Sequence, residues 1–558
     1  MWAVFALAGA AFVIGAAVGA FHAPEEQRVA ERFADAWRRG DYTAMRAEIS
    51  DAGRARATAK IFRRAYEVAA TTATATKLTI GKPRKDGDVY VLPVSVATRI
   101  FGTFRNRVVL PISGKGSKAK IDWRANLAFP GLGPGERLQR TTEMPPRAGL
   151  LARDGTPLAQ GPSRTSPLGE TARAAAGDLG PIPEDRAEEL RALGVPDGTQ
   201  VGTSGLERIF DTKLLGTPGG RLMAGTTVLA QRPPVRAHDL RTTIAPKVQE
   251  AAIAALAGRY GGVVALKPGT GEILAFAGIP FSGLQPPGST MKIVTLTGAL
   301  QAKIAGPSST YPYATEATIS GVKLANANGE SCGGTLTQAF AISCNSVFAP
   351  LGAKLGAKKL VATAEKFGFN GDPGLPGAAM SVIPQADTIG DDLAVGSSAI
   401  GQGVVQATTL QMTRVAATIA LGGRKPGLTL ERAKLAKPGP RLFPASVASA
   451  VRKMMVGVVT GGTGRSAQIA GVSVAGKTGT AELKTTHPCE PDPENPEACP
   501  EEDQVNDPTD TDAWFVAFAP SAKPRVVVGV LLVASGAGGD TAAPAARGVM
   551  AAALKSGA

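Results

Sequence analysis

The sequence predicts a multidomain α+β protein in which small mixed domains precede one large domain built on a five-stranded antiparallel sheet. Three observations support this fold class. The chain has 558 residues, more than one hydrophobic core usually organises, so roughly two to four domains are expected. Hydrophobic residues make up 44% and charged residues 19% of the chain, as in folded globular proteins. Helical patterns and strand patterns also alternate in separate blocks along the chain.

An uncharged segment opens the chain, because residues 1–21 contain no Asp, Glu, Lys or Arg. About 20 apolar residues are needed to cross a bilayer, and His22-Ala23-Pro24 is a poor small-x-small cleavage site. We therefore expect an uncleaved transmembrane anchor over 1–21 rather than a cleaved signal peptide, with the catalytic part extracytoplasmic at the cell membrane. No basic residue precedes the apolar run, which leaves the true start site open.

The next block, 25–135, is expected to be a small α+β cone. Val29, Phe33 and Trp37 recur at nearly helical spacing. Alternating strands are expected over 88–96 and 106–112, with a third near 119–123, and the aromatic residues of this block are expected to form its core. A Pro/Gly-rich stretch at 129–135 marks the end of the block.

The large domain is expected over 241–558. Strands at 262–266 and 273–277 flank a Gly-containing turn and predict a hairpin. Nearly 190 residues of mostly helical sequence follow, and three further strands are expected at 472–476, 513–518 and 525–532. The two early and three late strands would form one sheet with a helical lobe inserted between them, closed by a helix over 541–556.

Three short motifs in the large domain carry the chemistry: Ser289-Thr290-Met291-Lys292, Ser343-Cys344-Asn345 and Lys477-Thr478-Gly479-Thr480. A serine hydroxyl becomes nucleophilic when a base takes its proton, and a lysine can be that base when burial or a neighbouring cation lowers its pKa. Each motif alone is more often a helix cap, a solvated lysine or a β-turn. Together they supply a nucleophile, two amines, a second hydroxyl and an amide, which is a set suited to acyl transfer.

In this order the motifs resemble the S-x-x-K, S-x-N and K-[TS]-G signatures of the penicillin-binding and serine β-lactamase superfamily. The resemblance implies the penicillin-binding transpeptidase (serine β-lactamase-like) fold for 241–558. The segment from Pro146 to Ala159 and the Gly205-Leu206-Glu207-Arg208 segment resemble the pedestal, or dimerisation-type, domain of class B penicillin-binding proteins, expected over 140–240. The block at 25–135 resembles the NTF2-like domain of some class B members.

The resemblance implies a peptidoglycan D,D-transpeptidase that crosslinks stem peptides through an acyl-enzyme on Ser289 and binds penicillin covalently. Ser343 would protonate the leaving amine, Asn345 would hold the peptide amide, and Thr480 would share the oxyanion hole with Ser289. Gly479 would leave the strand edge open to a substrate backbone, next to which Lys477 and Thr478 would attract the substrate carboxylate. The implied catalytic set is Ser289, Lys292, Ser343, Asn345 and Lys477, and the implied substrate-binding set is Thr478, Gly479 and Thr480.

The expected partners are peptidoglycan stem peptides, the lipid-linked precursor, β-lactams, the membrane and a separate glycosyltransferase. We expect no metal and no organic cofactor. Nucleic acid is not expected despite a net charge of +15, because aromatic residues make up only 5% of the chain.

Two alternatives to the transpeptidase function are a D,D-carboxypeptidase or β-lactamase that passes the acyl group to water, and a non-catalytic β-lactam-binding sensor or scaffold. The sequence leaves open whether the protein serves elongation, division or sporulation, which amine accepts the acyl group, and its β-lactam affinity.

Two further features concern the C-terminal half. The four cysteines Cys332, Cys344, Cys489 and Cys499 lack metal-ligand spacing; they predict two local disulfides, Cys332–Cys344 and Cys489–Cys499, with four free thiols as the alternative. Residues 482–512 carry eleven acidic side chains against Lys484 alone. This insertion is interpreted either as a gate or partner surface beside the cleft or as a tolerated solvated loop.

Overall fold

The computed structural model describes residues 23–482 and 511–557. The expected anchor at 1–21, the expected Cys489–Cys499 disulfide and most of the acidic insertion lie outside these residues. Among the helices that are described, none is long and apolar enough to cross a bilayer. The chain forms two compact units. The N-terminal unit holds the described residues up to Ala148 with Gly180–Val201 and Thr212–His238, and the C-terminal unit holds Gly149–Leu179, Gly202–Asp211 and the chain from Asp239 onward.

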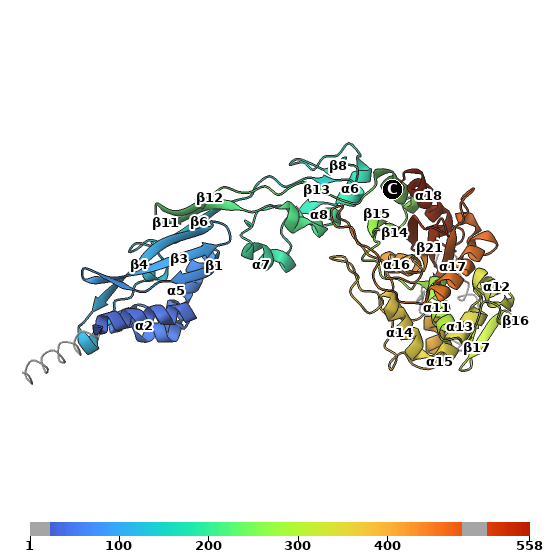
Figure 1. The fold of residues 1–558 in the computed structure, drawn as a ribbon, viewed down its shortest axis with the longest axis horizontal. Coiled ribbons are helices and arrows are strands. Elements are labelled where there is room, and N and C mark those ends of the chain that lie inside the picture. The colour runs from blue at the N-terminus through green and yellow to red at the C-terminus, as the bar shows by residue number, and fades with distance from the viewer. Residues whose placement is uncertain (1–22, 483–510, 558) are drawn as a thin grey trace, which may run out of the picture. The chain divides into compact units, whose positions relative to one another are not determined.

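The N-terminal unit packs helices against one face of a curved antiparallel sheet (Figure 1). The sheet has the order β1-β3-β4-β5, with β2 paired to β3. Its helices are α2 (Glu25–Arg39), α3 (Tyr42–Ala47), α4 (Asp51–Arg56) and α5 (Ala59–Thr72). Its strands are β1 (Ala75–Ile80), β2 (Arg84–Asp86), β3 (Val89–Thr98), β4 (Thr103–Ser113) and β5 (Lys120–Ile121).

The core of this unit is aromatic, as expected. Trp37 and Tyr66 pack edge to face at 5.2 Å between ring centroids, and the Trp123 indole N–H donates to the Tyr66 hydroxyl at 3.0 Å. Phe33 and Phe62 are fully buried beside them. A buried ring whose polar atom is already paired has no need of a ligand, so these residues stabilise the fold.

The remaining elements of the N-terminal unit are a three-stranded sheet and a helix. The sheet has the order β12-β11-β6. The elements are β6 (Leu138–Glu143), α7 (Glu184–Ala192), β11 (Gly219–Ala224) and β12 (Thr227–Arg232). Three short elements span the junctions between the units: β9 (Leu179–Gly180), β10 (Val201–Gly202) and α9 (Asp211–Leu214).

The C-terminal unit begins with a small sheet and two short helices. They are β7 (Leu150–Leu151), β8 (Pro157–Ala159), α6 (Glu170–Ala176), α8 (Gly205–Ile209) and β13 (Leu240–Arg241). The Gly205–Arg208 segment forms most of α8, where Glu207 is 1% exposed and accepts a hydrogen bond of 2.7 Å from Arg164 Nε. A buried carboxylate is tolerated when a guanidinium pairs with it, so this segment is structural.

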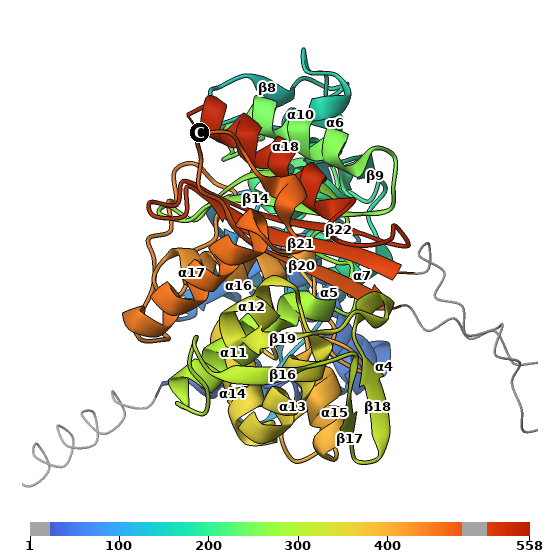
Figure 2. The same ribbon diagram turned by 90° about the vertical axis from the view of Figure 1, so that its right-hand side faces the viewer.

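The large sheet of the C-terminal unit is five-stranded and antiparallel, in the order β15-β14-β22-β21-β20. Helices α10 and α18 cover one face and α16 and α17 lie on the other (Figure 2). The strands are β14 (Gly261–Lys267), β15 (Glu272–Gly278), β20 (Ala475–Glu482), β21 (Thr511–Ala519) and β22 (Val526–Leu532). The helices named here are α10 (Pro246–Leu256), α16 (Thr409–Ala420), α17 (Ala445–Thr460) and α18 (Ala542–Lys555).

The helical lobe is inserted between β15 and β20, as expected from the sequence. Its other helices are α11 (Lys292–Gln301), α12 (Leu336–Ala341), α13 (Asn345–Leu355), α14 (Ala357–Phe367) and α15 (Asp392–Ala399). The lobe also contains four short strands that the sequence did not predict: β16 (Thr310–Ala314), β17 (Glu316–Ile319), β18 (Val322–Ala325) and β19 (Cys332–Thr335). They pair two by two, β16 with β19 and β17 with β18. The side chains of β16 and β18 are largely exposed and lack the apolar alternation that marks a strand in a sequence.

Candidate active site

The Ser289 turn is held between a strand and a glycine loop. Ser289 lies in a 3₁₀ turn, Gly288–Met291, directly before α11. A Cβ atom on Gly288 would lie 2.6 Å from the Thr480 carbonyl oxygen, and the Gly288 N–H donates to the Gly401 carbonyl at 3.0 Å. A Cβ atom on Gly401 would lie only 2.1 Å from the Gly288 oxygen. Glycine is therefore required at both positions. The absence of a Cβ atom there lets the Ser289 turn pack closely against both β20 and the Gly401 backbone.

Ser343 joins α12 to α13 in a backbone conformation that is rare for a residue with a Cβ. Its φ is +67°, in the left-handed region that usually costs about 1–3 kcal/mol. The next residue, Cys344, forms a disulfide with Cys332 of β19, which confirms the first of the two expected pairings. The Asn345 side-chain amide donates to the Ala325 carbonyl at 2.9 Å. The Ser-Cys-Asn segment is thus fixed by a covalent bond and by a hydrogen bond to β18.

Lys292 is buried below this segment. Its Nζ atom donates to the Ser343 carbonyl at 2.6 Å and to Asn345 Oδ1 at 2.7 Å, and lies 3.3 Å from the Ser343 hydroxyl. Burial, followed by repulsion from Lys477, lowers the pKa of Lys292 well below its ordinary value. A neutral amine has two N–H donors and one lone pair, and the two close oxygens engage both donors. The lone pair of Lys292 is then left as a proton acceptor.

Lys477 is also fully buried, and its amine is directed at Ser343. Nζ lies 2.8 Å from the Ser343 hydroxyl and 3.0 Å from the Thr478 carbonyl. Burial lowers the pKa of Lys477 to about 7. The ring of Phe340 lies 5.5 Å from its Nζ, close enough for a cation–π contact. The expectation that Lys477 would attract a substrate carboxylate stays a prediction; in the structure its amine faces the Ser343 hydroxyl.

The third motif lies inside β20, not at the end of a strand as expected. β20 is the end strand of the sheet among the described residues, so its outer edge can accept an extended chain. Glycine is also required at position 479 for close packing, because a Cβ atom there would lie 2.9 Å from the Pro287 carbonyl oxygen and 3.0 Å from Thr290 Cγ2. The absence of a side chain at Gly479 therefore lets the Ser289 turn approach the strand.

The five residues predicted to be catalytic thus meet in one region of the C-terminal unit. Hydrogen bonds join Lys292, Ser343, Asn345 and Lys477. Ser289 lies in the turn directly before the helix that begins at Lys292 and is partly exposed, and its hydroxyl has no hydrogen-bond partner among the described residues. Thr463 was missed by the sequence reasoning. Its hydroxyl lies 2.6 Å from that of Thr478. In the sequence, the only indication of a functional position was the glycine-rich stretch around Thr463.

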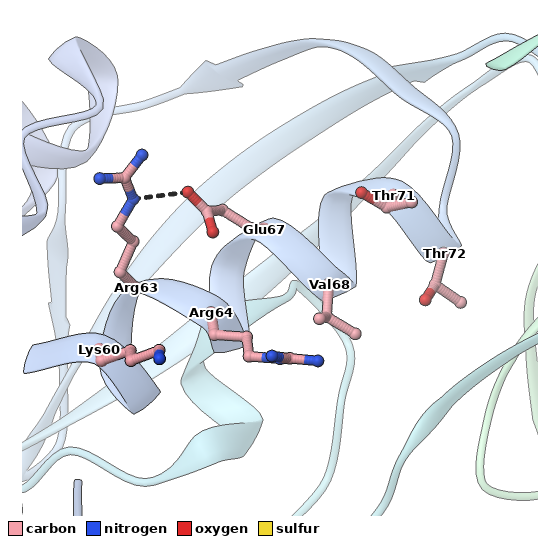
Figure 3. A pocket seen from close by; sticks show the side chains of 7 residues that line it. All are labelled: Lys60, Arg63, Arg64, Glu67, Val68, Thr71 and Thr72. Carbon is pink, nitrogen blue, oxygen red and sulfur yellow. Dashed lines mark hydrogen bonds and ion pairs between the residues drawn. The ribbon is translucent and has the colours of Figure 1, made fainter. Parts of the chain in front are cut away.

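Two cavities lie in the N-terminal unit and contain none of these residues. One, of about 530 Å³, runs along α5 between Lys60 and Thr72, where Arg63 and Glu67 are bonded to each other (Figure 3). The other, of about 460 Å³, lies between β4 and the segment that follows β5. Neither contains a nucleophile beside a base, and within the described part of the chain no group of acidic, Cys or His side chains could hold a metal.

Comparison with known proteins identifies the family. Residues 261–551 match the family model described as penicillin-binding protein transpeptidase domain. Residues 144–231 match the penicillin-binding protein dimerisation domain, and residues 24–136 match the NTF2-like N-terminal transpeptidase domain.

Two proteins named peptidoglycan D,D-transpeptidase PbpA are among the similar sequences. The one from Mycolicibacterium smegmatis is 34% identical over 420 residues, covering 64% of this chain and 80% of that protein. The one from Mycobacterium tuberculosis is 32% identical over 383 residues, covering 57% of this chain and 73% of that protein.

Two solved structures are also similar. Penicillin-binding protein A of M. tuberculosis, in a ceftriaxone acyl-enzyme complex, has a TM-score of 0.57 and 27% identity, covering 73% of this chain and 98% of that one. Pseudomonas aeruginosa PBP2 in complex with WCK 5153 has a TM-score of 0.61 and 25% identity, covering 75% and 96%. These matches confirm the resemblance and the fold class that the sequence predicted. The chain belongs to the penicillin-binding protein transpeptidase family, as a class B member with an NTF2-like N-terminal domain.

Proposed function

We propose that this protein is a serine-type peptidoglycan D,D-transpeptidase that acts through an acyl-enzyme on Ser289 and is acylated by β-lactams at the same residue. The observation that carries the proposal is the placement of the Lys292 amine. Two of its N–H donors face oxygens at 2.6 and 2.7 Å, and burial lowers the pKa of the amine well below its ordinary value, which favours the neutral form with one lone pair. The names of the relatives and the acyl-enzyme structure of one of them support the reaction class and the covalent binding of penicillin.

In the first step, Ser289 Oγ attacks the carbonyl carbon of the penultimate D-alanine of a stem peptide while Lys292 Nζ takes the hydroxyl proton. The carbonyl oxygen becomes an oxyanion, and we assign the backbone N–H groups of Ser289 and Thr480 as its hydrogen-bond donors. Loss of one such donor typically raises the activation free energy by about 3 kcal/mol. The carbon–nitrogen bond then breaks. The departing D-alanine amine takes the proton of the Ser343 hydroxyl, and Lys292, 3.3 Å from that hydroxyl, replaces it.

In the second step, the amine of a neighbouring stem peptide attacks the Ser289 ester. Its proton leaves along the same route in reverse, the ester bond breaks, and the Ser289 hydroxyl is restored. Asn345 and the free edge of β20 would align the donor peptide, and Thr478 would receive its terminal carboxylate. Lys477 would act through Ser343, because its Nζ lies 2.8 Å from that hydroxyl.

Labelling with a fluorescent penicillin tests the nucleophile. We expect stable labelling of the wild-type protein and none of Ser289→Ala, whereas Ser535→Ala, on a serine outside all three motifs, should label normally. Persistent labelling of Ser289→Ala would falsify the assignment.

Crosslinked product from lipid-linked precursor, made with a separate glycosyltransferase, tests transpeptidation itself. Rapid release of the label would instead indicate a hydrolase, which passes the acyl group to water.

We also propose that the uncharged segment 1–21 anchors the protein in the cell membrane, with both described units outside the cytoplasm. The Cys332–Cys344 disulfide supports this location, because disulfides persist mainly in oxidising compartments. The full chain should remain in the membrane pellet after an alkaline carbonate wash, and a chain beginning at residue 23 should not. Recovery of both in the supernatant would refute the anchor.

A further inference from the structure

Thr463 connects two of the three motifs through contacts of its own. It lies in the segment between α17 and β20, and its Oγ1 is 2.6 Å from Thr478 Oγ1. Its backbone N–H donates to the Ala341 carbonyl at 3.1 Å, two residues before Ser343. One threonine therefore contacts both the strand that carries Thr478 and the chain that leads into the Ser343 turn.

Close backbone packing fixes this threonine from two sides. A Cβ atom on Gly462 would lie 2.1 Å from the Ala341 carbonyl oxygen, and a Cβ atom on Gly539 would lie 2.4 Å from the Thr463 carbonyl oxygen. Both separations are shorter than a van der Waals contact, so only glycine fits at either position. The backbone of Thr463 is thus held in place, while its side chain is exposed and that of Thr478 is 5% exposed.

The contact between the two hydroxyls decides where the Thr478 proton points. A hydroxyl donates one hydrogen bond and can accept two. If Thr478 donates to Thr463, no proton is left for a substrate, and if Thr463 donates to Thr478, the Thr478 proton is free. The other acceptor near Thr463 Oγ1 is the Ala341 carbonyl at 3.5 Å, at the limit of a hydrogen bond, so Thr478 is its main partner.

A carboxylate only accepts hydrogen bonds. Its arrival beside Thr478 favours the arrangement in which Thr463 donates to Thr478 and Thr478 donates to the carboxylate. Hydrogen bonds in such a chain polarise one another and become stronger. A carboxamide can also donate, so it gains less from this arrangement.

We propose that Thr463 is a positioning residue that makes the site select acyl donors ending in a free carboxylate, by holding the Thr478 hydroxyl proton toward that carboxylate. This inference rests on the proposed function, which places the carboxylate of the acyl donor beside Thr478. It assigns a role to a residue outside all three motifs.

The test measures carboxylate preference with and without acyl transfer. The probes are an acyl-D-Ala-D-Ala peptide and the same peptide ending in a carboxamide. Their dissociation constants are measured by NMR titration on Ser289→Ala, which cannot form the ester, and kcat/KM is measured for matched thioester donors on proteins that retain Ser289. The variants are Thr463→Val, which keeps the shape and loses the hydroxyl, and Thr463→Ser, which restores it. Thr460→Val is the matched control, because within the described part of the chain the Thr460 hydroxyl donates only to the Val456 carbonyl of its own helix.

We expect the ratio of carboxylate to carboxamide binding to fall about tenfold in Thr463→Val, the effect of weakening one hydrogen bond to a charged group. Thr463→Ser and Thr460→Val should keep the wild-type ratio. An unchanged ratio in Thr463→Val, or an equal fall in Thr460→Val, overturns the role of Thr463. The binding ratio does not depend on chemistry at Ser289, so a failure of penicillin labelling counts against the proposed function and not against this inference.

Discussion

The Lys477 amine lies 2.8 Å from the hydroxyl of Ser343, a residue 134 positions earlier in the chain. Lys292 Nζ lies 3.3 Å from the same hydroxyl. Two buried amines therefore share one hydroxyl. A positive charge on Lys477 opposes protonation of Lys292, because like charges close together repel each other. Burial first, and then repulsion from Lys477, lower the pKa of Lys292.

Lys477→Met should move the acid limb of the acylation rate to higher pH. The change removes the positive charge that opposes protonation of Lys292, so the pKa of Lys292 rises and the neutral amine is lost at a higher pH. The rate should also fall by roughly a hundredfold or more, because the Ser343 hydroxyl loses a partner in proton transfer. The measurement is the pH profile of penicillin acylation. Lys267→Met, on β14 of the same sheet, is the control and should leave the acid limb where it is.

Stability should rise with pH above neutrality in the wild-type protein. The pKa of Lys477 is about 7 in the folded protein, against an ordinary value of 10.5. Below pH 7 both states carry the proton. Between these two values the unfolded state binds more protons than the folded state, so the free energy of unfolding rises with pH. Lys292 adds a slope of the same sign. Thermal unfolding followed from pH 6 to pH 10 should show a shallower rise in Lys477→Met, and an identical slope in both proteins would contradict the buried amine.

Gly401→Ala should slow acylation far more than Gly403→Ala. Both glycines have a left-handed φ, +79° and +70°, so both variants carry a similar backbone strain of about 1–2 kcal/mol. Only the Cβ at Gly401 meets another atom, the Gly288 carbonyl oxygen at 2.1 Å, while the Cβ at Gly403 has open space. Displacing the Ser289 turn by about 1 Å is expected to cost roughly a hundredfold. Stopped-flow acylation measures the difference, and equal losses in the two variants would show that the contact does not matter.

Removing the disulfide through Cys332→Ser/Cys344→Ser should both destabilise and slow the enzyme. The bond closes a loop with a sequence separation of 12, and closing a loop of about 15 residues contributes roughly 3 kcal/mol. It also adjoins Ser343, whose left-handed φ the surroundings must enforce. Denaturant unfolding and acylation rates are the measurements, with the reduced wild-type protein as the comparison. A variant that matches the oxidised wild type in both would show that the bond is dispensable.

Local pattern was sufficient for much of the fold. The spacing of Val29, Phe33 and Trp37 predicted α2, and the apolar runs around the turn at 267–271 predicted the hairpin of β14 and β15. Strands without a clear apolar alternation were missed. β2 is exposed along its whole length, and β16–β19 have few buried side chains, so their existence depends on pairing partners elsewhere in the chain.

The sequence by itself determined which chemical groups the site contains: a nucleophile, two amines, a second hydroxyl and an amide. It could do so because residue type decides which protons a group can hold. Only the tertiary structure decided which atoms these groups face. Lys477 lies within β20 and is directed at Ser343, Thr463 meets Thr478, and Gly401 and Gly479 leave room for the Ser289 turn. These contacts join residues far apart in the chain. They arise from the packing of an inserted lobe against a sheet, and a short motif contains no information about how closely two such surfaces approach.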